Sequence, residues 1–78
     1  MREKKEPDRI STKMFSAALE HTKRRGGLTG FQASRSEREI FMKTAIRQGL
    51  ISWNVLEGNY VLTAAGQKRL IVYQKAFA

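Results

Sequence analysis

The chain lacks cysteine altogether and contains a single histidine, His21. Without cysteine it can form neither a disulfide nor a thiolate metal site, and without a second histidine nearby His21 has no partner for metal binding or acid–base chemistry. The glycine-rich stretch at residues 26–30 also lacks the Gly-Lys-Ser/Thr ending of a phosphate-binding loop. We therefore expect no catalytic residue, no metal and no small-molecule cofactor, and the protein is not predicted to be an enzyme.

Long apolar runs are missing as well. The longest, residues 70–73, is far shorter than the roughly 20 apolar residues that a membrane-spanning helix needs. Residues 1–5 lack the apolar segment of a secretory signal. These absences predict a cytoplasmic protein that does not associate with a membrane.

Acidic residues are scarce relative to basic ones. Seven Asp and Glu face fifteen Lys and Arg, so the 78 residues carry a formal net charge of +8. This balance favours a polyanionic partner. The excess is spread along the chain, so it lies in the folded part rather than in a tail. The only proline, Pro7, lies in a charged stretch with little to bury. We predict a flexible charged arm over residues 1–9 and a single domain over residues 10–78.

The first helix is predicted to begin near Ser11 or Thr12, either of which can cap it, and to end at Gly26. Its apolar face follows the i, i+1, i+4, i+5 spacing of a helix and consists of Met14, Phe15, Ala18 and Leu19. Residues 26–33 are rich in glycine, which argues against a long helix. Two structures remain open there: a single helical turn, or a short extended segment that pairs with a later hairpin.

The second helix, residues 35–48, is the clearest element. Ser34 or Ser36 caps it, a glutamate follows three residues later as in a capping box, and Gly49 ends it. Glu39 and Lys43 have the spacing of a favourable ion pair. Its predicted polar face comprises Ser36, Glu39, Lys43 and Arg47, and Arg35 and Arg38 extend that face at the first turn.

Two short strands, residues 50–53 and 60–62, are predicted to form a hairpin. With Trp53 opposite Tyr60, Ile51 lies opposite Leu62, so all four side chains share one face. We expect that face to be buried, and replacement of Trp53 by alanine to cost about 3–5 kcal/mol. The six residues from Asn54 to Asn59 would form the tip.

A last helix follows Thr63, which can cap it. Its first apolar face consists of Leu70, Tyr73 and Phe77. Ile71 and Val72 add a second apolar face, which is more than one small body can cover. We expect this helix to form a homodimer interface.

Three segments of this second half carry a resemblance to a known family. They are Gly49-Leu50-Ile51, Tyr60-Val61-Leu62-Thr63 and Ala65-Gly66-Gln67. With the helix before them, they resemble the recognition helix and wing of winged-helix (winged helix-turn-helix) DNA-binding regulators, over residues 34–70. The resemblance implies an α+β, mainly helical fold with about three helices and a C-terminal two-stranded hairpin, the wing, followed by a helix.

The resemblance also implies a function: a sequence-specific DNA-binding protein, a transcriptional regulator, that places helix 35–48 in the major groove of double-stranded DNA. Arg35 and Arg38 would reach base edges or flanking phosphates, and Lys43 and Arg47 would meet phosphates. The candidate DNA-binding residues are Ser34, Arg35, Ser36, Arg38, Glu39, Lys43, Arg47, Asn54 and Asn59.

Three features depart from the family pattern, and one of them is the negative charge that Glu37 and Glu39 put near the start of the second helix. The stretch between the first two helices leaves room for at most about one turn of the family's second helix. The tip carries Glu57 and no Lys or Arg, so phosphate contact there would use Asn54, Asn59 or backbone amides. Two other functions remain open: a winged-helix module that binds a protein, and a basic protein that binds RNA or the ribosome.

Overall fold

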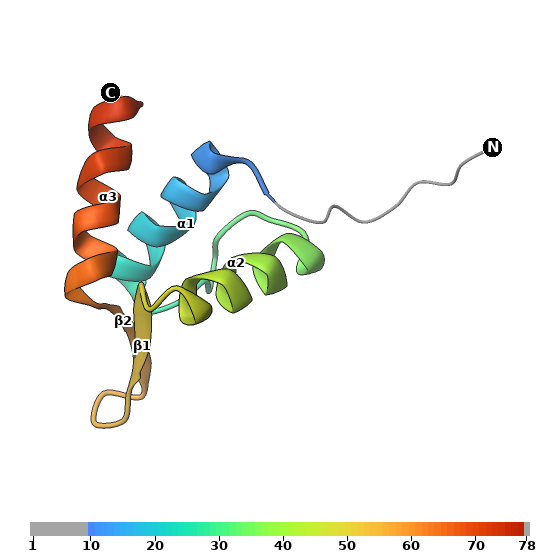
Figure 1. Ribbon diagram of the computed structural model, residues 1–78. Coiled ribbons are helices and arrows are strands. Elements are labelled where there is room, and N and C mark those ends of the chain that lie inside the picture. Colours follow the sequence, from blue (N-terminus) through green and yellow to red (C-terminus); the bar gives the residue numbers. More distant parts are fainter. Residues whose placement is uncertain (1–9, 78) are drawn as a thin grey trace.

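The computed structural model describes residues 10–77, and five elements follow one another within this part of the chain (Figure 1). They are α1 (Thr12–Arg25), α2 (Arg35–Arg47), β1 (Ile51–Asn54), β2 (Asn59–Leu62) and α3 (Ala64–Ala76). Three helices and an antiparallel hairpin confirm the expected α+β, mainly helical class. The arm predicted over residues 1–9 lies outside the described residues.

Helix α1 begins and ends where its local signals predict. The hydroxyl of Ser11 accepts a hydrogen bond from the amide of Met14 at 3.0 Å, which satisfies one of the unpaired donors of the first turn. Gly26 ends the helix with a φ of 79°, a left-handed conformation that suits glycine. Thr22, the one buried polar residue of the described core, is satisfied because its hydroxyl donates to the Ala18 carbonyl at 2.9 Å.

The stretch between α1 and α2 adopts neither of the two structures that the sequence left open. It contains no helical turn and no strand, and one backbone bond, from the Tyr60 amide to the Gly26 carbonyl at 2.8 Å, joins it to the hairpin. His21 holds the stretch against α1, because its ring nitrogen Nε2 donates to the Thr29 carbonyl at 2.7 Å. Phe31 is half-buried and packs against the core and the His21 ring. The family's second helix therefore has no counterpart between α1 and α2.

Helix α2 starts with a complete capping box. The Ser34 hydroxyl accepts from the Glu37 amide at 3.1 Å, and the Glu37 carboxylate accepts from the Ser34 amide at 2.9 Å. This settles the choice of cap in favour of Ser34. The predicted partner of Glu39 was wrong: its carboxylate pairs with Arg35 at 3.4 Å rather than with Lys43.

The hairpin has the predicted register, with Ile51 opposite Leu62 and Trp53 opposite Tyr60. Its tip is shorter than expected. Asn54 pairs with Asn59 as the last rung of the ladder, so the turn itself consists of residues 55–58.

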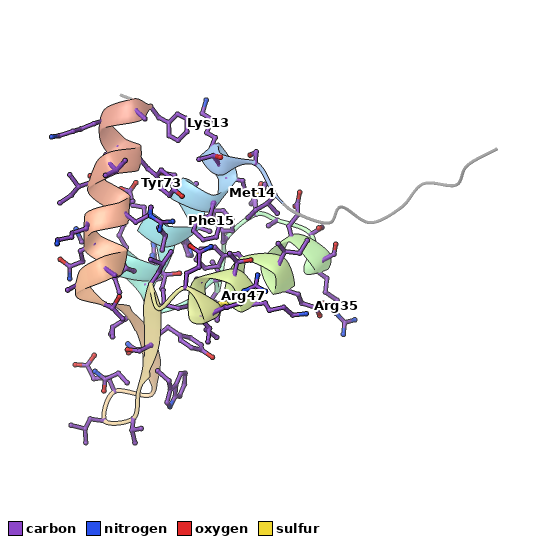
Figure 2. The ribbon with its side chains drawn as sticks, in the orientation of Figure 1. Lys13, Met14, Phe15, Arg35, Arg47 and Tyr73 are labelled. Atoms are coloured by element: carbon purple, nitrogen blue, oxygen red, sulfur yellow. The ribbon has the colours of Figure 1, made fainter. Side chains whose placement is uncertain are left out.

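The core lies where α1, α2, α3 and the inner end of the hairpin meet. The ring of Phe15 packs edge-on against Phe41 at a centroid distance of 4.9 Å, and against Tyr73 of α3 at 6.2 Å. Figure 2 shows Tyr73 directed from α3 toward α1. The buried apolar residues are Phe15, Ala18, Leu19, Phe41, Ala45, Leu50, Ile51, Leu62 and Leu70.

Trp53 does not belong to this core, contrary to the prediction, because 53% of its surface is exposed. The hairpin extends past the helices (Figure 1), so only its inner pair, Ile51 and Leu62, reaches the buried interior. Alternation placed Trp53 on the correct face, but the body is too short to cover that face along its whole length. Among residues 10–77, no helix has the length and apolar character needed to cross a membrane.

Candidate nucleic-acid interface

Helix α2 presents a polar face to solvent because its opposite side is held in the core. Phe41 and Ala45 are buried, each at 1% exposure or less. Figure 2 shows Arg35 and Arg47 on the side of α2 that faces away from α1. The exposed charged residues of the helix are Arg35, Arg38, Glu39, Lys43 and Arg47.

The exposed charged residues of α2 do not all lie on one face of the helix. At about 100° per residue, Lys43 and Arg47 lie about 40° apart on the outer face, and Ser36 lies between them in projection. Arg38 is about 140° away from Lys43 around the same helix. Its guanidinium lies instead near the stretch before α2, where Nη2 donates to the Phe31 carbonyl at 3.5 Å. The structure thus brings Lys43 and Arg47 together and sets Arg38 apart from them.

Arg35 and Glu39 form an exposed pair at the start of the outer face. Their side chains are 92% and 67% exposed. An ion pair so open to water contributes little to stability, typically below about 1 kcal/mol. The Arg35 guanidinium can therefore leave Glu39 and bind a phosphate at a small cost in free energy. The negative charge of Glu39 would remain beside it.

The two serines of the candidate set differ in their position. Ser34 is exposed, but its hydroxyl and its amide are both used in the capping box. Ser36 is half-buried and lies on the outer side of α2. A contact from Ser34 to a ligand would thus compete with the helix cap.

The two asparagines of the hairpin are held by local contacts. Asn54 holds its own turn, because its carboxamide oxygen accepts from the Glu57 amide at 3.1 Å. Asn59 packs against Gly26, so closely that a Cβ added at Gly26 would lie 2.8 Å from the Asn59 amide nitrogen. The Asn59 oxygen Oδ1 is buried and has no hydrogen-bond partner among the described residues. Both side chains therefore serve the hairpin and its junction with α1.

Sequence reasoning missed a concave site between the hairpin and α2, which we call the hairpin groove. Its volume is about 460 Å³. The exposed ring of Trp53 packs edge-on against Tyr60, with centroids 4.9 Å apart, and the two aromatic residues line the groove together with Arg38 and Met42 of α2. The remaining lining residues are Gly26, Gly27, Leu28, Thr29, Gly58 and Asn59.

The sequence predicted one part of this groove, the pairing of Trp53 and Tyr60 on one face of the hairpin. The strand alternation placed Trp53 and Tyr60 on one face, but no local signal shows that the face extends beyond the helices. The opposite wall depends on how residues 26–29 fold back against β2, which is a tertiary contact. Within residues 10–77, no cluster of three or more His, Asp or Glu gathers that would hold a metal ion.

No protein-family model, no curated protein and no solved structure matches this chain. The function of this chain is therefore inferred from the charges and surfaces described above.

Proposed function

We propose that the protein is a small DNA-binding protein of the winged-helix type, a transcriptional regulator that places α2 in the major groove of double-stranded DNA. One observation carries the proposal. Lys43 and Arg47 lie one turn apart on the exposed face of α2, and no carboxylate of residues 10–77 pairs with either of them. The major groove of B-DNA is wide enough to admit a helix, and exposed cations on its flank meet phosphates.

The fold supports this use of α2. The helix is capped at Ser34, buried at Phe41 and followed directly by the hairpin, so its orientation is held from behind while its outer face stays open. A rigid helix loses little conformational entropy when it binds. In this arrangement Lys43 and Arg47 contact phosphates, and Arg35, in the first turn, reaches toward base edges.

A salt titration with mixed-sequence duplex DNA tests the proposal. If four to six phosphates are neutralised, the slope of log affinity against log salt is expected near −4 to −5, following the roughly −0.9 per phosphate of B-DNA. Lys43→Ala should weaken binding to all sequences alike and reduce that slope by about one unit. Lys23→Ala, which removes the same charge from α1, is the matched control and should be close to neutral.

Two results would contradict the proposal. One is a parent protein whose duplex binding does not depend on salt. The other is a set of Arg35, Lys43 and Arg47 alanine variants that all bind duplex DNA as the parent does.

A second function, binding to a protein partner, is favoured by the hairpin tip. Val55 and Leu56 are 79% and 96% exposed, and the only charge beside them is the carboxylate of Glu57. The carboxylate of Glu57 would repel phosphates, whereas the exposed apolar side chains of Val55 and Leu56 could be buried in a pocket of a partner protein. Retention of a protein partner by the parent and its loss in Leu56→Asp, without any effect of Lys43→Ala, would support this second function.

A further inference from the structure

The hairpin groove combines two aromatic rings with one cation and no acid. Trp53, Tyr60 and Arg38 all line it, and none of the ten lining residues is Asp or Glu. Its volume of about 460 Å³ lies within the roughly 300–1,000 Å³ typical of small-ligand sites.

An exposed tryptophan that is also held in place is suited to stacking. Half of the Trp53 surface faces solvent, while Tyr60 restrains the ring by an edge-to-face contact with an interplanar angle of 73°. A restrained ring has already lost much of the rotational freedom that stacking would otherwise cost. Aromatic side chains next to arginine are the recurrent chemistry of sites for unpaired bases, in which the ring meets the base and the guanidinium meets a phosphate.

We propose that the hairpin groove holds one unpaired nucleotide of DNA, with its base stacked on Trp53 and its phosphate at Arg38. This inference rests on the proposed function, since the nucleotide belongs to a DNA molecule whose paired part is bound by α2. The charge balance selects this occupant, because a groove with a cation and no carboxylate, on a chain of net charge +8, favours an anionic ligand.

The division of cations on α2 agrees with two separate roles. Lys43 and Arg47 face outward, whereas Arg38 lines the groove. The only hydrogen bond of its side chain in the described structure, to the Phe31 carbonyl, is long at 3.5 Å, so the guanidinium can turn to a phosphate at little cost.

The chain carries its own reporter for the test, because Trp53 is its only tryptophan. We would titrate the full chain with three DNA ligands: a fully paired duplex, the same duplex with one unpaired thymidine, and a single-stranded oligothymidylate. The two ligands with unpaired bases should quench Trp53 fluorescence, and the paired duplex should not. Unpaired uridine in an RNA strand forms a fourth arm, and quenching by RNA alone would overturn the assignment to DNA.

Three variants separate stacking from general apolar contact. Trp53→Ala should lower affinity for the duplex with an unpaired thymidine by about 5- to 150-fold, the range expected for loss of one stacked base, and leave affinity for the paired duplex unchanged. Trp53→Phe should keep most of the affinity and Trp53→Leu should not, because leucine supplies apolar surface without a ring. Leu56→Ala, at the tip and outside the groove, is the matched control and should bind both ligands as the parent does.

The results distinguish this inference from the proposed function. Salt-dependent duplex binding that is weakened by Lys43→Ala, with no Trp53 quenching by any unpaired base, would overturn the groove assignment alone. Affinity for ligands with unpaired bases that Trp53→Leu lowers and Trp53→Phe keeps, with no binding to the paired duplex, would support the groove and refute the role of α2 in the major groove.

Discussion

Ile51 and Trp53 lie on the same face of β1, yet the first is buried and the second is half in water. Because Trp53 loses only part of its surface on folding, Trp53→Ala should lower the free energy of unfolding by about 1–2 kcal/mol, which includes the contact with Tyr60. Phe41→Ala, at a fully buried ring, should cost about 3–5 kcal/mol. Urea denaturation followed by circular dichroism measures both. A Trp53→Ala protein as unstable as Phe41→Ala would show that the outer hairpin is packed rather than exposed.

Gly66 has a tertiary reason to be glycine. It lies in the first turn of α3, and a Cβ at this position would collide with the Leu50 carbonyl oxygen. Alanine is normally the better helix residue by about 1 kcal/mol, yet Gly66→Ala should destabilise the fold by about 1–3 kcal/mol or more, because the backbone of α3 must move away from Leu50. Gly27→Ala is the control, since a Cβ at Gly27 meets no atom within 4 Å. Equal thermal unfolding of the two variants would contradict this close approach.

The Ser34 hydroxyl caps α2 and is also a candidate contact to DNA. Ser34→Ala should cost about 1 kcal/mol of stability through loss of the cap, whereas Ser34→Gly should cost only a few tenths, because glycine is tolerated at this position. Both variants lack the hydroxyl. If Ser34 only caps the helix, DNA affinity should be nearly normal for both folded proteins; an equal loss of affinity in the two would instead show that the hydroxyl contacts DNA.

The elements differ in how well their sequences predicted them. Helices α1 and α2 each have a capping serine before their first turn, Ser11 or Ser34, and a glycine after their last turn. Both helices lie where these signals predict them. The hairpin register followed from alternation alone. The turn was predicted too long because asparagine is common in turns. Here Asn54 and Asn59 instead form the last pair of the two-stranded ladder.

At the scale of the whole molecule, α3 leaves apolar surface uncovered. Leu70 and Tyr73 pack toward α1, while Ile71 and Val72 are 52% and 60% exposed. The homodimer through α3 remains a prediction, and this face is where we expect it. Deletion of the helix would not test it, since the buried Leu70 would be lost as well.

Surface substitutions test the dimer without disturbing the core. The parent should sediment as a dimer at micromolar concentration, and a double variant, Ile71→Gln with Val72→Gln, should sediment as a monomer, because the second copy loses the apolar face that it covers. Lys75→Gln, exposed on the same helix, is the control and should leave the parent species unchanged. A parent protein that stays monomeric at high concentration would exclude this interface.

Local sequence alone determined where the helices begin and end to within about two residues, the strand register, the identity of most core residues and the positive charge of α2, because each depends on neighbours within a few residues or on simple periodicity. Only the tertiary structure decided that Trp53 is exposed, that Asn59 is turned against Gly26 and that Arg38 is separated from Lys43. These features depend on how far the hairpin extends past the body and on how the stretch between α1 and α2 folds back to β2. Both are set by contacts between residues far apart in the chain, for which no local pattern exists.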